Sequence, residues 1–448
     1  MRLNPLVCCI SLLATGMTAC RAATPAEISH IVSEMDSSRM EQTIRKLVSF
    51  GTRNTLSTQT DPNRGIGAAR DWLYGEYQKI ARESGGRLQV ELQSFEQAPG
   101  PRVPQPTRLT NIIAMLPGDR YTPEQRVYVV SGHYDSMPSS PTDPTSDAPG
   151  ANDDASGTAA VLEMARVMSK YHFDAPIVFV AVAGEEQGLL GSAYAAEQMK
   201  QKGWAVRAMF TNDIIGNSHG GNGIVDNRSV RVFSEGVPTD ETPAQAAVRR
   251  SVGGENDGPS RQLARYIKEV GERFVPSFRV TLVYRRDRYS RGGDHIPFLE
   301  RGFPAVRFTE PNEDYRHQHQ NVRTVEGVQY GDLPDFVDFA YAAQVARVNA
   351  AALAMLASAP DSPRNATLSA RLSYDTTLSW SPVADPDLSG YEIVWRSTDS
   401  PAWSKSRFVG NVTTFTLAGM SKDNFLYGVR AIDKLGRKSP VAWPRPGR

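Results

Sequence analysis

Two near-continuous apolar runs constrain the fold of this chain more than any other feature of its sequence. Val127–Ser131 and Ile177–Ala183 are apolar at almost every position, and a glycine follows each of them. A strand with apolar residues on both faces is buried on both sides, which is typical of parallel sheets covered by helices. Helical patterns follow the two runs, at Gly157–Lys170 and Leu189–Gln201. The sequence therefore predicts an α/β domain with a mixed, mostly parallel central sheet flanked by helices.

Further periodic segments extend this α/β domain in both directions. Apolar residues recur at helical spacing in Ala26–Phe50, Ile66–Arg82, Gln262–Phe274 and Phe336–Ala357. Strand patterns occur at Leu88–Phe95, Leu109–Leu116 and Ala305–Thr309. A chain of 448 residues is too long for one ordinary domain, and its length suggests a main body of roughly 250–330 residues plus a smaller unit.

The pattern changes after residue 358. Ala359–Pro363 is a short linker rich in proline, and beyond it short strands alternate with turns and no helix is predicted. This pattern is typical of an all-β sandwich. The motif Leu378-x-Trp380 and the run Tyr427–Asp433 resemble a fibronectin type III domain. We therefore expect a main α/β domain over 24–358, a linker over 359–363 and a sandwich over 364–448, with the first domain stable on its own.

The first 23 residues have the pattern of an export signal. Arg2 precedes the apolar run Leu6–Leu13, which is too short to span a bilayer as a mature helix. Met17–Cys20 resembles a bacterial lipobox, in which Cys20 would carry a lipid, and cleavage by an ordinary signal peptidase near Ala22 or Ala23 is the alternative. We therefore expect an exported bacterial protein that is periplasmic, secreted or a lipoprotein, with an N-terminal lipid as its only possible membrane attachment.

Charge and cysteine content exclude several classes of function. The 50 basic and 49 acidic residues give a net charge of +1, which provides no electrostatic reason to expect a nucleic-acid partner. All three cysteines lie within the first 20 residues. The rest of the chain therefore has no disulfide and no catalytic thiol. The sequence gives no indication of the oligomeric state.

Histidine and carboxylate side chains follow the predicted strands, or precede a predicted helix, at five places. Ligands collect outside the carboxyl ends of the strands in an open α/β sheet, so we expect these side chains to meet there. Each segment also has an ordinary explanation, since an acidic residue before a helix commonly caps it. The side chains concerned are His133, Asp135, Asp153, Glu185, Glu186, Asp213, His317 and His319.

Two of these segments indicate a metal site. Glu185 and Glu186 are adjacent carboxylates that repel one another unless cations or a shared proton relieve them. Their side chains diverge, so one can bind a metal while the other faces the substrate as a base. Asp135 suits a supporting role, accepting the second ring N–H of His133.

In order, the five segments resemble the M28 family of co-catalytic zinc peptidases, over roughly Thr110–Ala357. The resemblance implies a fold of the zinc exopeptidase type, two Zn²⁺ ions and peptide substrates. It makes Asp153 the carboxylate that bridges the ions, with a cis peptide bond to Asp154, and Glu185 the general base. One ion is completed by His133 and Asp213, and the other by Glu186 and a late histidine. The motifs are His133-x-Asp135, Gly150–Gly157, Gly184-Glu185-Glu186-x-Gly188, Asp213-x-Ile215-Gly216 and the late histidine.

The late histidine can be either of two residues. The family commonly has a Tyr-His-Thr-x-x-Asp context, and this chain departs from it. Spacing to Asn321 favours His317, whereas the run Gln318-His319-Gln320 favours His319, which we choose. Tyr315 is a candidate for stabilising an oxyanion, with simple packing as the alternative.

The activity that the resemblance implies is release of N-terminal residues from peptides. Carboxypeptidases and one-zinc glutaminyl cyclases on the same fold are alternatives, as is a secreted binding protein in which the enzyme domain is secondary. We interpret Asp294-His295 as structural support for the site. The arginines at 285, 286, 288 and 291 form either a solvated loop or a docking point for carboxylate groups.

Overall fold

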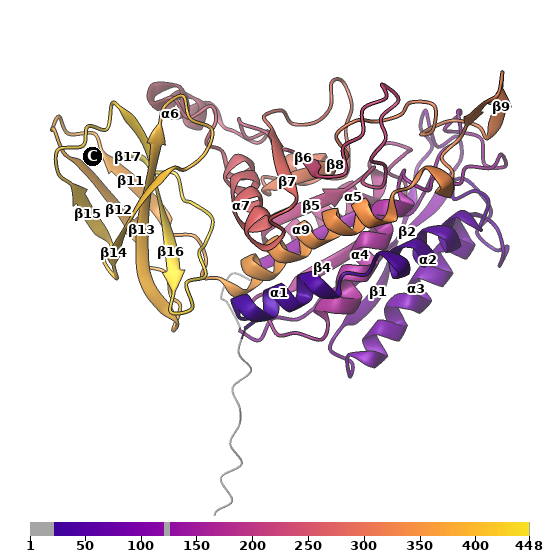
Figure 1. Ribbon diagram of the computed structural model, residues 1–448, viewed down its shortest axis with the longest axis horizontal. Helices are drawn as coiled ribbons and strands as arrows, with labels where there is room; N and C mark the ends of the chain where they lie inside the picture. The colour runs from indigo at the N-terminus through magenta and orange to yellow at the C-terminus, as the bar shows by residue number, and fades with distance from the viewer. Residues whose placement is uncertain (1–21, 121–125, 448) are drawn as a thin grey trace, which may run out of the picture.

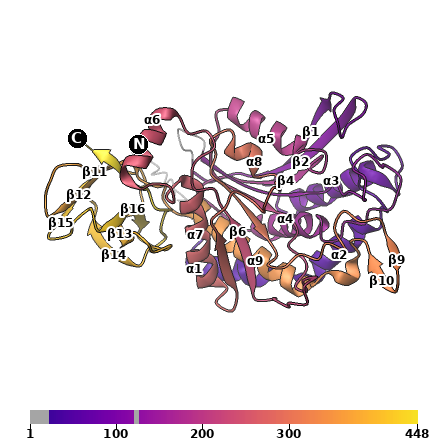
Figure 2. The ribbon, with the colours of Figure 1, turned by 90° about the horizontal axis from the view of Figure 1, so that it is seen from above.

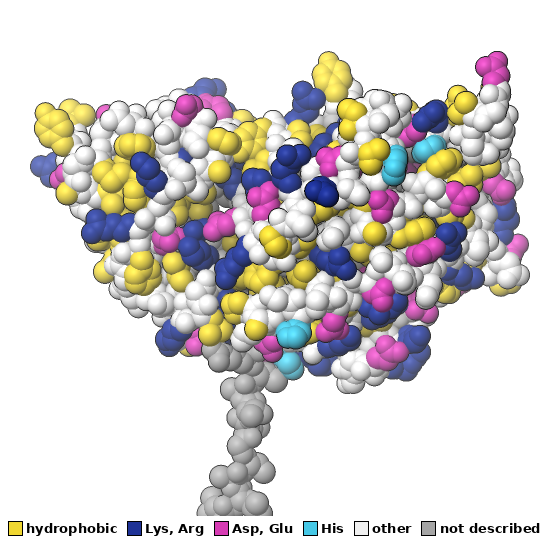
Figure 3. All heavy atoms as spheres, in the orientation of Figure 1, with side chains coloured by type: hydrophobic (Ala, Val, Ile, Leu, Met, Phe, Trp, Pro, Cys, Tyr) yellow, Lys and Arg dark blue, Asp and Glu magenta, His cyan; other side chains and the backbone are white. Residues whose placement is uncertain are grey.

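The computed structural model describes residues 22–120 and 126–447 (Figure 1). An α/β part forms most of the molecule, and an all-β part, yellow in Figure 1, lies at one end of it. Basic and acidic side chains are interspersed over the face that Figure 3 shows. Apart from Ala22 and Ala23, the predicted export signal and the lipobox-like segment lie outside the described residues.

Eight of the described strands form the central sheet, in the order β1-β2-β4-β3-β5-β8-β6-β7. Strands β4, β3, β5 and β8 are parallel, β6 pairs parallel with β7, and the pairs β1–β2, β2–β4 and β6–β8 are antiparallel. The mixed, mostly parallel core of the predicted sheet is therefore confirmed. The strands are β1 (Gln89–Gln97), β2 (Thr107–Leu116), β3 (Arg126–His133), β4 (Ile177–Val182), β5 (Ala205–Asn212), β6 (Ser229–Phe233), β7 (Arg279–Val283) and β8 (Ala305–Thr309).

Helices cover both faces of this sheet (Figure 2). Helices α1, α2, α3, α4, α7 and α9 bury their apolar residues in one large core, and α5 and α8 contribute to a smaller core on the other face. Helix α9 is long and apolar enough to cross a membrane by composition, but most of it is buried in the large core. The helices are α1 (Pro25–Glu34), α2 (Ser37–Val48), α3 (Gly65–Glu83), α4 (Ala155–Met168), α5 (Leu190–Gln201), α6 (Pro243–Val252), α7 (Pro259–Phe274), α8 (Ile296–Leu299) and α9 (Phe339–Ser358).

The N-terminal helical segment differs from the prediction of one helix over Ala26–Phe50. The first helix ends at Glu34, and Asp36 caps a second helix by accepting the backbone N–H groups of Ser38 and Arg39. A capping carboxylate satisfies donors that the first turn of a helix leaves unpaired. Apolar periodicity continues across the break, which is why the pattern predicts a single helix.

The all-β part consists of two sheets around one shared core, as predicted for a sandwich. Trp380, Tyr391 and Tyr427 are among its large buried side chains. One sheet has the order β15-β12-β11-β17 and the other β14-β13-β16. These strands are β11 (Arg364–Ser369), β12 (Thr376–Ser381), β13 (Leu388–Ser397), β14 (Lys405–Gly410), β15 (Thr414–Leu417), β16 (Phe425–Asp433) and β17 (Arg445–Gly447); a hairpin of β9 (Arg323–Val325) and β10 (Val328–Tyr330) and the 3₁₀ turn η1 (Pro334–Phe336) precede α9.

Ion pairs join the sandwich to the α/β part, and one of them is fully buried. Arg396 on β13 lies 2.8 and 2.7 Å from the two carboxylate oxygens of Asp257, and neither side chain is exposed by more than 1%. Arg265 on α7 approaches the same carboxylate at 3.0 Å. On β16, Arg430 pairs with Glu269 of α7 at 2.8 Å. A short linker alone gives no sign of this interface, and we now expect a chain cut after residue 358 to lose stability.

We predict that Arg396→Met destabilises the protein by about 3 kcal/mol. Removing one partner of a buried ion pair costs about 3–5 kcal/mol, and the lower end applies because Arg265 still faces Asp257. Denaturant unfolding of the full chain measures the change. The control is Glu41→Gln, which removes an exposed pair with Arg45 and costs less than about 1 kcal/mol. Equal unfolding midpoints for the two variants would show that the interface contributes little.

Candidate metal centre

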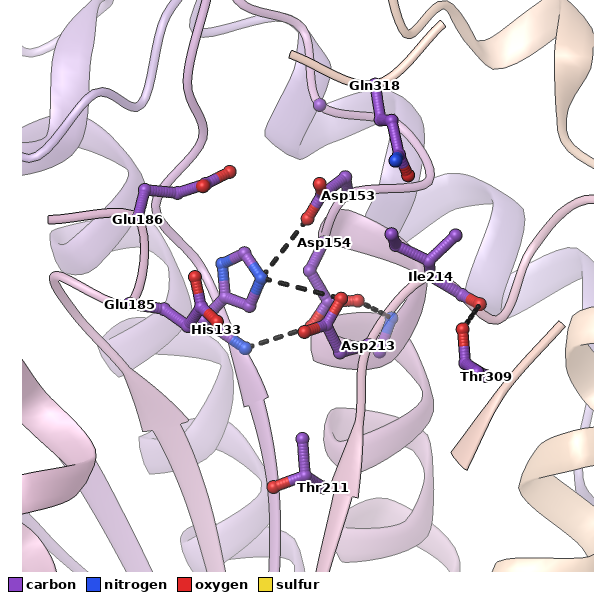
Figure 4. A network of polar contacts seen from close by, with 12 residues as sticks. His133, Asp153, Asp154, Glu185, Glu186, Thr211, Asp213, Ile214, Thr309 and Gln318 are labelled. Atoms are coloured by element: carbon purple, nitrogen blue, oxygen red, sulfur yellow. Dashed lines mark hydrogen bonds and ion pairs between the residues drawn. The ribbon is translucent and has the colours of Figure 1, made fainter. Parts of the chain in front are cut away.

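Elements of the central sheet bring the predicted side chains to one place (Figure 4). His133 is the last residue of β3, and Asp213 directly follows β5. Glu185 and Glu186 follow β4, and Asp153 lies just before α4. These positions lie at the carboxyl ends of neighbouring parallel strands, where ligand sites form in open α/β sheets.

Asp153 lies between two histidines. Its Oδ1 is 3.2 Å from His133 Nε2, and its Oδ2 is 3.0 Å from His319 Nε2. His133 Nε2 also lies 3.9 Å from Asp213 Oδ1, and His319 Nε2 lies 3.0 Å from Glu186 Oε2. The carboxylate of Asp153 therefore presents one oxygen to each half of the cluster.

Two groups of potential ligand atoms result from this arrangement. In each group, one nitrogen or oxygen atom from every member lies within 4.8 Å of the corresponding atoms of the others. One group consists of His133, Glu185 and Asp213, and the other of Asp153, Glu186 and His319. All the residues that the resemblance implied as ligands are brought together, together with the implied base.

The structure places His319 in this cluster and His317 outside it. The ring of His317 stacks on Phe336 with centroids 3.8 Å apart, and its Nε2 lies 3.7 Å from Asp314 Oδ2. The spacing to Asn321 favoured His317, but the loop turns so that the side chain of His319 faces the cluster instead. Tyr315, the other residue singled out nearby, is 69% exposed.

The two aspartates before α4 have different tasks. Asp154 caps the helix by accepting the N–H of Gly157 at 2.9 Å, and it also accepts the N–H of His133 at 3.0 Å. Asp153 is left to face the histidines. The peptide bond between the aspartates is cis, as the resemblance implied. The capping explanation and the metal explanation of this segment therefore apply to different residues.

The donor set fits divalent metal ions. Four carboxylates and two histidines meet here; Glu185 and His319 are partly exposed and the other four side chains are buried. Among the described residues, His133 Nε2 has no hydrogen-bond partner. Burial, with Asp213 and Glu186 nearby, raises the pKa of Glu185 well above its ordinary value. Burial alone would lower the pKa of His319, but Glu186 and Asp153 raise it to about 11. Neighbouring carboxylates contribute to both upward shifts in pKa, and nitrogen with carboxylate oxygen is a typical ligand set for zinc.

Asp135 supports the site in a way that differs from the expected one. His133 Nδ1 lies 3.2 Å from the backbone oxygen of Asp135 and 3.6 Å from its carboxylate. The carboxylate instead accepts the backbone N–H groups of Glu185 and Glu186, both at 3.2 Å, and the hydroxyl of Thr55 at 3.0 Å. Asp135 therefore fixes the backbone that carries both glutamates.

Sequence reasoning missed two further supporting residues. Arg307 on β8 is fully buried and lies 2.7 Å from Asp213 Oδ2. Asp332 accepts the backbone N–H groups of Asn152 and Asp153, at 2.9 and 2.6 Å. A charged residue inside the apolar strand Ala305–Thr309 was an available signal for Arg307. Asp332 lies in an irregular loop, and no local pattern distinguishes it.

Three of the four arginines in the arginine-rich loop pair with carboxylates of the protein itself. Arg288 and Arg291 lie 3.3 and 2.5 Å from the carboxylate of Glu313, and Arg286 lies 3.4 Å from Glu300. His295 is fully buried and makes a 2.9 Å contact with the backbone oxygen of Arg286, in keeping with structural support.

Comparisons with known proteins identify the family. The family model for Peptidase family M28 matches residues 111–342. A probable zinc metalloprotease of the fungus Leptosphaeria maculans is 47% identical, over 96% of this chain and 100% of its own length. The chain belongs to peptidase family M28. A second relative, a probable zinc metalloprotease of Pyricularia oryzae, is 48% identical over 94% of this chain and 85% of its own length.

Solved structures confirm the fold expected of an M28 peptidase. The LapA aminopeptidase of Legionella pneumophila superposes with a TM-score of 0.52 at 20% identity, covering 74% of this chain and 75% of its own. The aminopeptidase from Aneurinibacillus sp. strain AM-1 gives 0.51 at 14% identity, covering 74% and 96%. At these identities the likeness concerns the fold alone.

The M28 relatives correct the expected origin of the chain. The curated relatives come from the fungi Leptosphaeria, Pyricularia, Pyrenophora and Phaeosphaeria. The expectation of a bacterial protein is therefore wrong, and with it the bacterial lipobox at Met17–Cys20, because a motif of four residues arises readily without function. Export through the signal predicted over residues 1–23 stays a prediction.

We predict that Asp135→Asn lowers the free energy of unfolding of the metal-free protein by about 1–3 kcal/mol. The new amide can accept only one of the two N–H groups, and a buried donor without a partner costs about that much. Denaturant unfolding after chelation measures the change. Thr55→Val is the control, because it removes one donor to Asp135 and leaves both glutamate N–H contacts. A larger loss in Thr55→Val would contradict the role of Asp135.

Proposed function

We propose that this M28 peptidase is a two-zinc aminopeptidase that releases N-terminal residues from peptides. Its family and the relatives named zinc metalloproteases identify it as a zinc metalloprotease. The observation that carries the finer proposal is Asp153, which faces His133 with one oxygen and His319 with the other. A carboxylate in that position can bridge two ions.

The proposed ligands divide between the two ions. His133, Asp213 and Asp153 would hold one ion, and Glu186, His319 and Asp153 the other. Three protein ligands for each ion leave positions for water and substrate, which is typical of catalytic rather than structural sites. When bound, such ions acidify water and polarise a carbonyl group, which is the chemistry that peptide hydrolysis needs.

Glu185 is the proposed general base. Its backbone N–H is fixed by Asp135, and one of its oxygens lies within 4.8 Å of ligand atoms of His133 and Asp213. From that position the carboxylate can take a proton from the attacking water. It then donates the proton to the leaving amine, which must be protonated before it departs.

The arginines near the site favour release from the amino end of a substrate over release from the carboxyl end. Arg288 and Arg291, which would suit a C-terminal carboxylate, are paired with Glu313. The two groups of ligand atoms also favour two ions over the single zinc of glutaminyl cyclases. A complete cluster with its base argues against an enzyme domain that is only secondary to binding.

We also propose the domain organisation expected from the sequence, with a fibronectin type III-like module over 364–448. The buried interface between Arg396 and Asp257 supports a structural role for this module. Rigid attachment to α7 makes it part of the enzyme body rather than a loosely tethered binding domain.

Substrates blocked at either end test this function. We expect an unblocked peptide to be cleaved from its amino end, and its N-acetylated form to be cleaved about 10–100-fold more slowly. Acetylation removes the charged ammonium group, and with it a hydrogen bond that involves a charged group, which contributes about 1.5–3 kcal/mol. Amidation of the carboxyl end should change kcat/KM little. Sensitivity to the carboxyl end alone would instead identify a carboxypeptidase.

Substitutions at the two neighbouring glutamates distinguish the general base from the metal ligand. Glu185→Gln should keep two zinc ions per chain and lower kcat by about 10²–10⁴-fold with little change in KM, because it removes the proton acceptor. Glu186→Gln should weaken the binding of one ion, since an amide oxygen is a poorer ligand than a carboxylate. Metal analysis and steady-state kinetics measure both effects. The reverse pattern, or one ion per wild-type chain, would contradict the assignment.

A further inference from the structure

The loop that carries His319 has no regular secondary structure to hold it. Residues 310–322 connect β8 to β9 without a helix or strand. His319 itself has φ = 53°, in the left-handed region that costs a residue other than glycine free energy. Contacts elsewhere in the loop must therefore keep His319 Nε2 at 3.0 Å from Asp153 and Glu186.

Glu313 anchors this loop to two other segments. Its carboxylate lies 3.0 Å from Nη2 of Arg231 on β6, and 3.3 and 2.5 Å from Nη1 of Arg288 and Arg291 in the segment after β7. Only 3% of the Glu313 side chain is exposed. Ion pairs buried to this extent are screened by solvent far less than exposed pairs, so the anchor is firm.

Gln318 connects the anchor to the histidine. Its Nε2 donates to Glu313 Oε2 at 3.2 Å, and it directly precedes His319 in the chain. Figure 4 shows its side chain on the same side of the cluster as Asp153. We propose that Glu313 is a positioning residue that, through Gln318, sets His319 against Asp153 and Glu186. This inference rests on the metal-ligand role proposed above for His319.

Asp314 provides a matched control within the same loop. It is the next residue in the chain, its side chain is 4% exposed, and it also pairs with an arginine, Arg316. Its carboxylate lies 3.7 Å from His317 Nε2 instead of contacting the His319 side of the loop. The two variants Glu313→Gln and Asp314→Asn therefore make the same chemical change at adjacent positions, of which Glu313 is the one that contacts Gln318.

Zinc titration of the metal-free full-length protein, with a competing chelator, tests the inference. Glu313→Gln should weaken the binding of one of the two ions by about 10–100-fold, as is typical when a residue supporting a metal ligand is lost. The other ion should bind as in the wild type. Asp314→Asn should leave both affinities unchanged. Gln318→Leu keeps the pairs between Glu313 and the arginines, and it should weaken the same ion.

Each other outcome decides against a part of the proposal. Wild-type affinities in both Glu313→Gln and Gln318→Leu would overturn it, and so would equal loss of both ions together with a lower melting temperature. If Glu313→Gln fails to fold, Gln318→Leu decides alone. His319→Ala separates the two levels of inference. If His319→Ala binds both ions, the ligand role itself is wrong; if it loses one while the other variants lose none, only the positioning role is wrong.

Discussion

Crowding of carboxylates at one edge of the central sheet is the constraint on which the rest of the structure depends. Asp153, Glu185, Glu186 and Asp213 meet there because neighbouring parallel strands end at the same edge. Like charges that are buried together repel strongly, so the surrounding chain has to compensate for them. Part of the compensation is the guanidinium of Arg307, which is buried in β8 and pairs with Asp213 at 2.7 Å.

Other buried contacts around the cluster hold the backbone segments that carry these carboxylates. Arg53 is fully buried and donates to the backbone oxygens of residues 134, 149 and 150, at 2.7, 2.6 and 2.9 Å, which ties the end of β3 to the loop that carries Asp153. Asp332 holds that same loop through two backbone N–H groups, and Asp135 holds the two that follow β4. Because the backbone is held, the repelling carboxylates cannot move apart. The protein therefore has a preformed site whose charge favours binding of cations.

The sequence predicted the parts of this arrangement that depend on local pattern. Apolar runs that end in glycine identified β3, β4 and the residues beyond them, because burial on both faces leaves a continuous apolar signal. Strands β6 and β7 and helix α6 went unrecognised, since they are short or, for α6, have no buried residue. The interface through Asp257 and Arg396 joins residues far apart in the chain. Contacts of that kind depend on tertiary structure, and no spacing in a single sequence encodes them.

The proposed ligands also differ in how firmly the fold holds them. His133 is the last residue of β3, Asp213 directly follows β5, and the backbone N–H of Asp153 is held by Asp332. An ion bound to these three side chains therefore requires little further ordering of the chain. The other ion depends on His319, which has a left-handed backbone conformation and lies in a loop without regular secondary structure. Any freedom that this loop retains must be lost on binding, and that loss of entropy reduces affinity. We therefore expect the ion at His133 to bind more tightly, and Asp153, shared by both, to become better placed for the second ion once the first is bound.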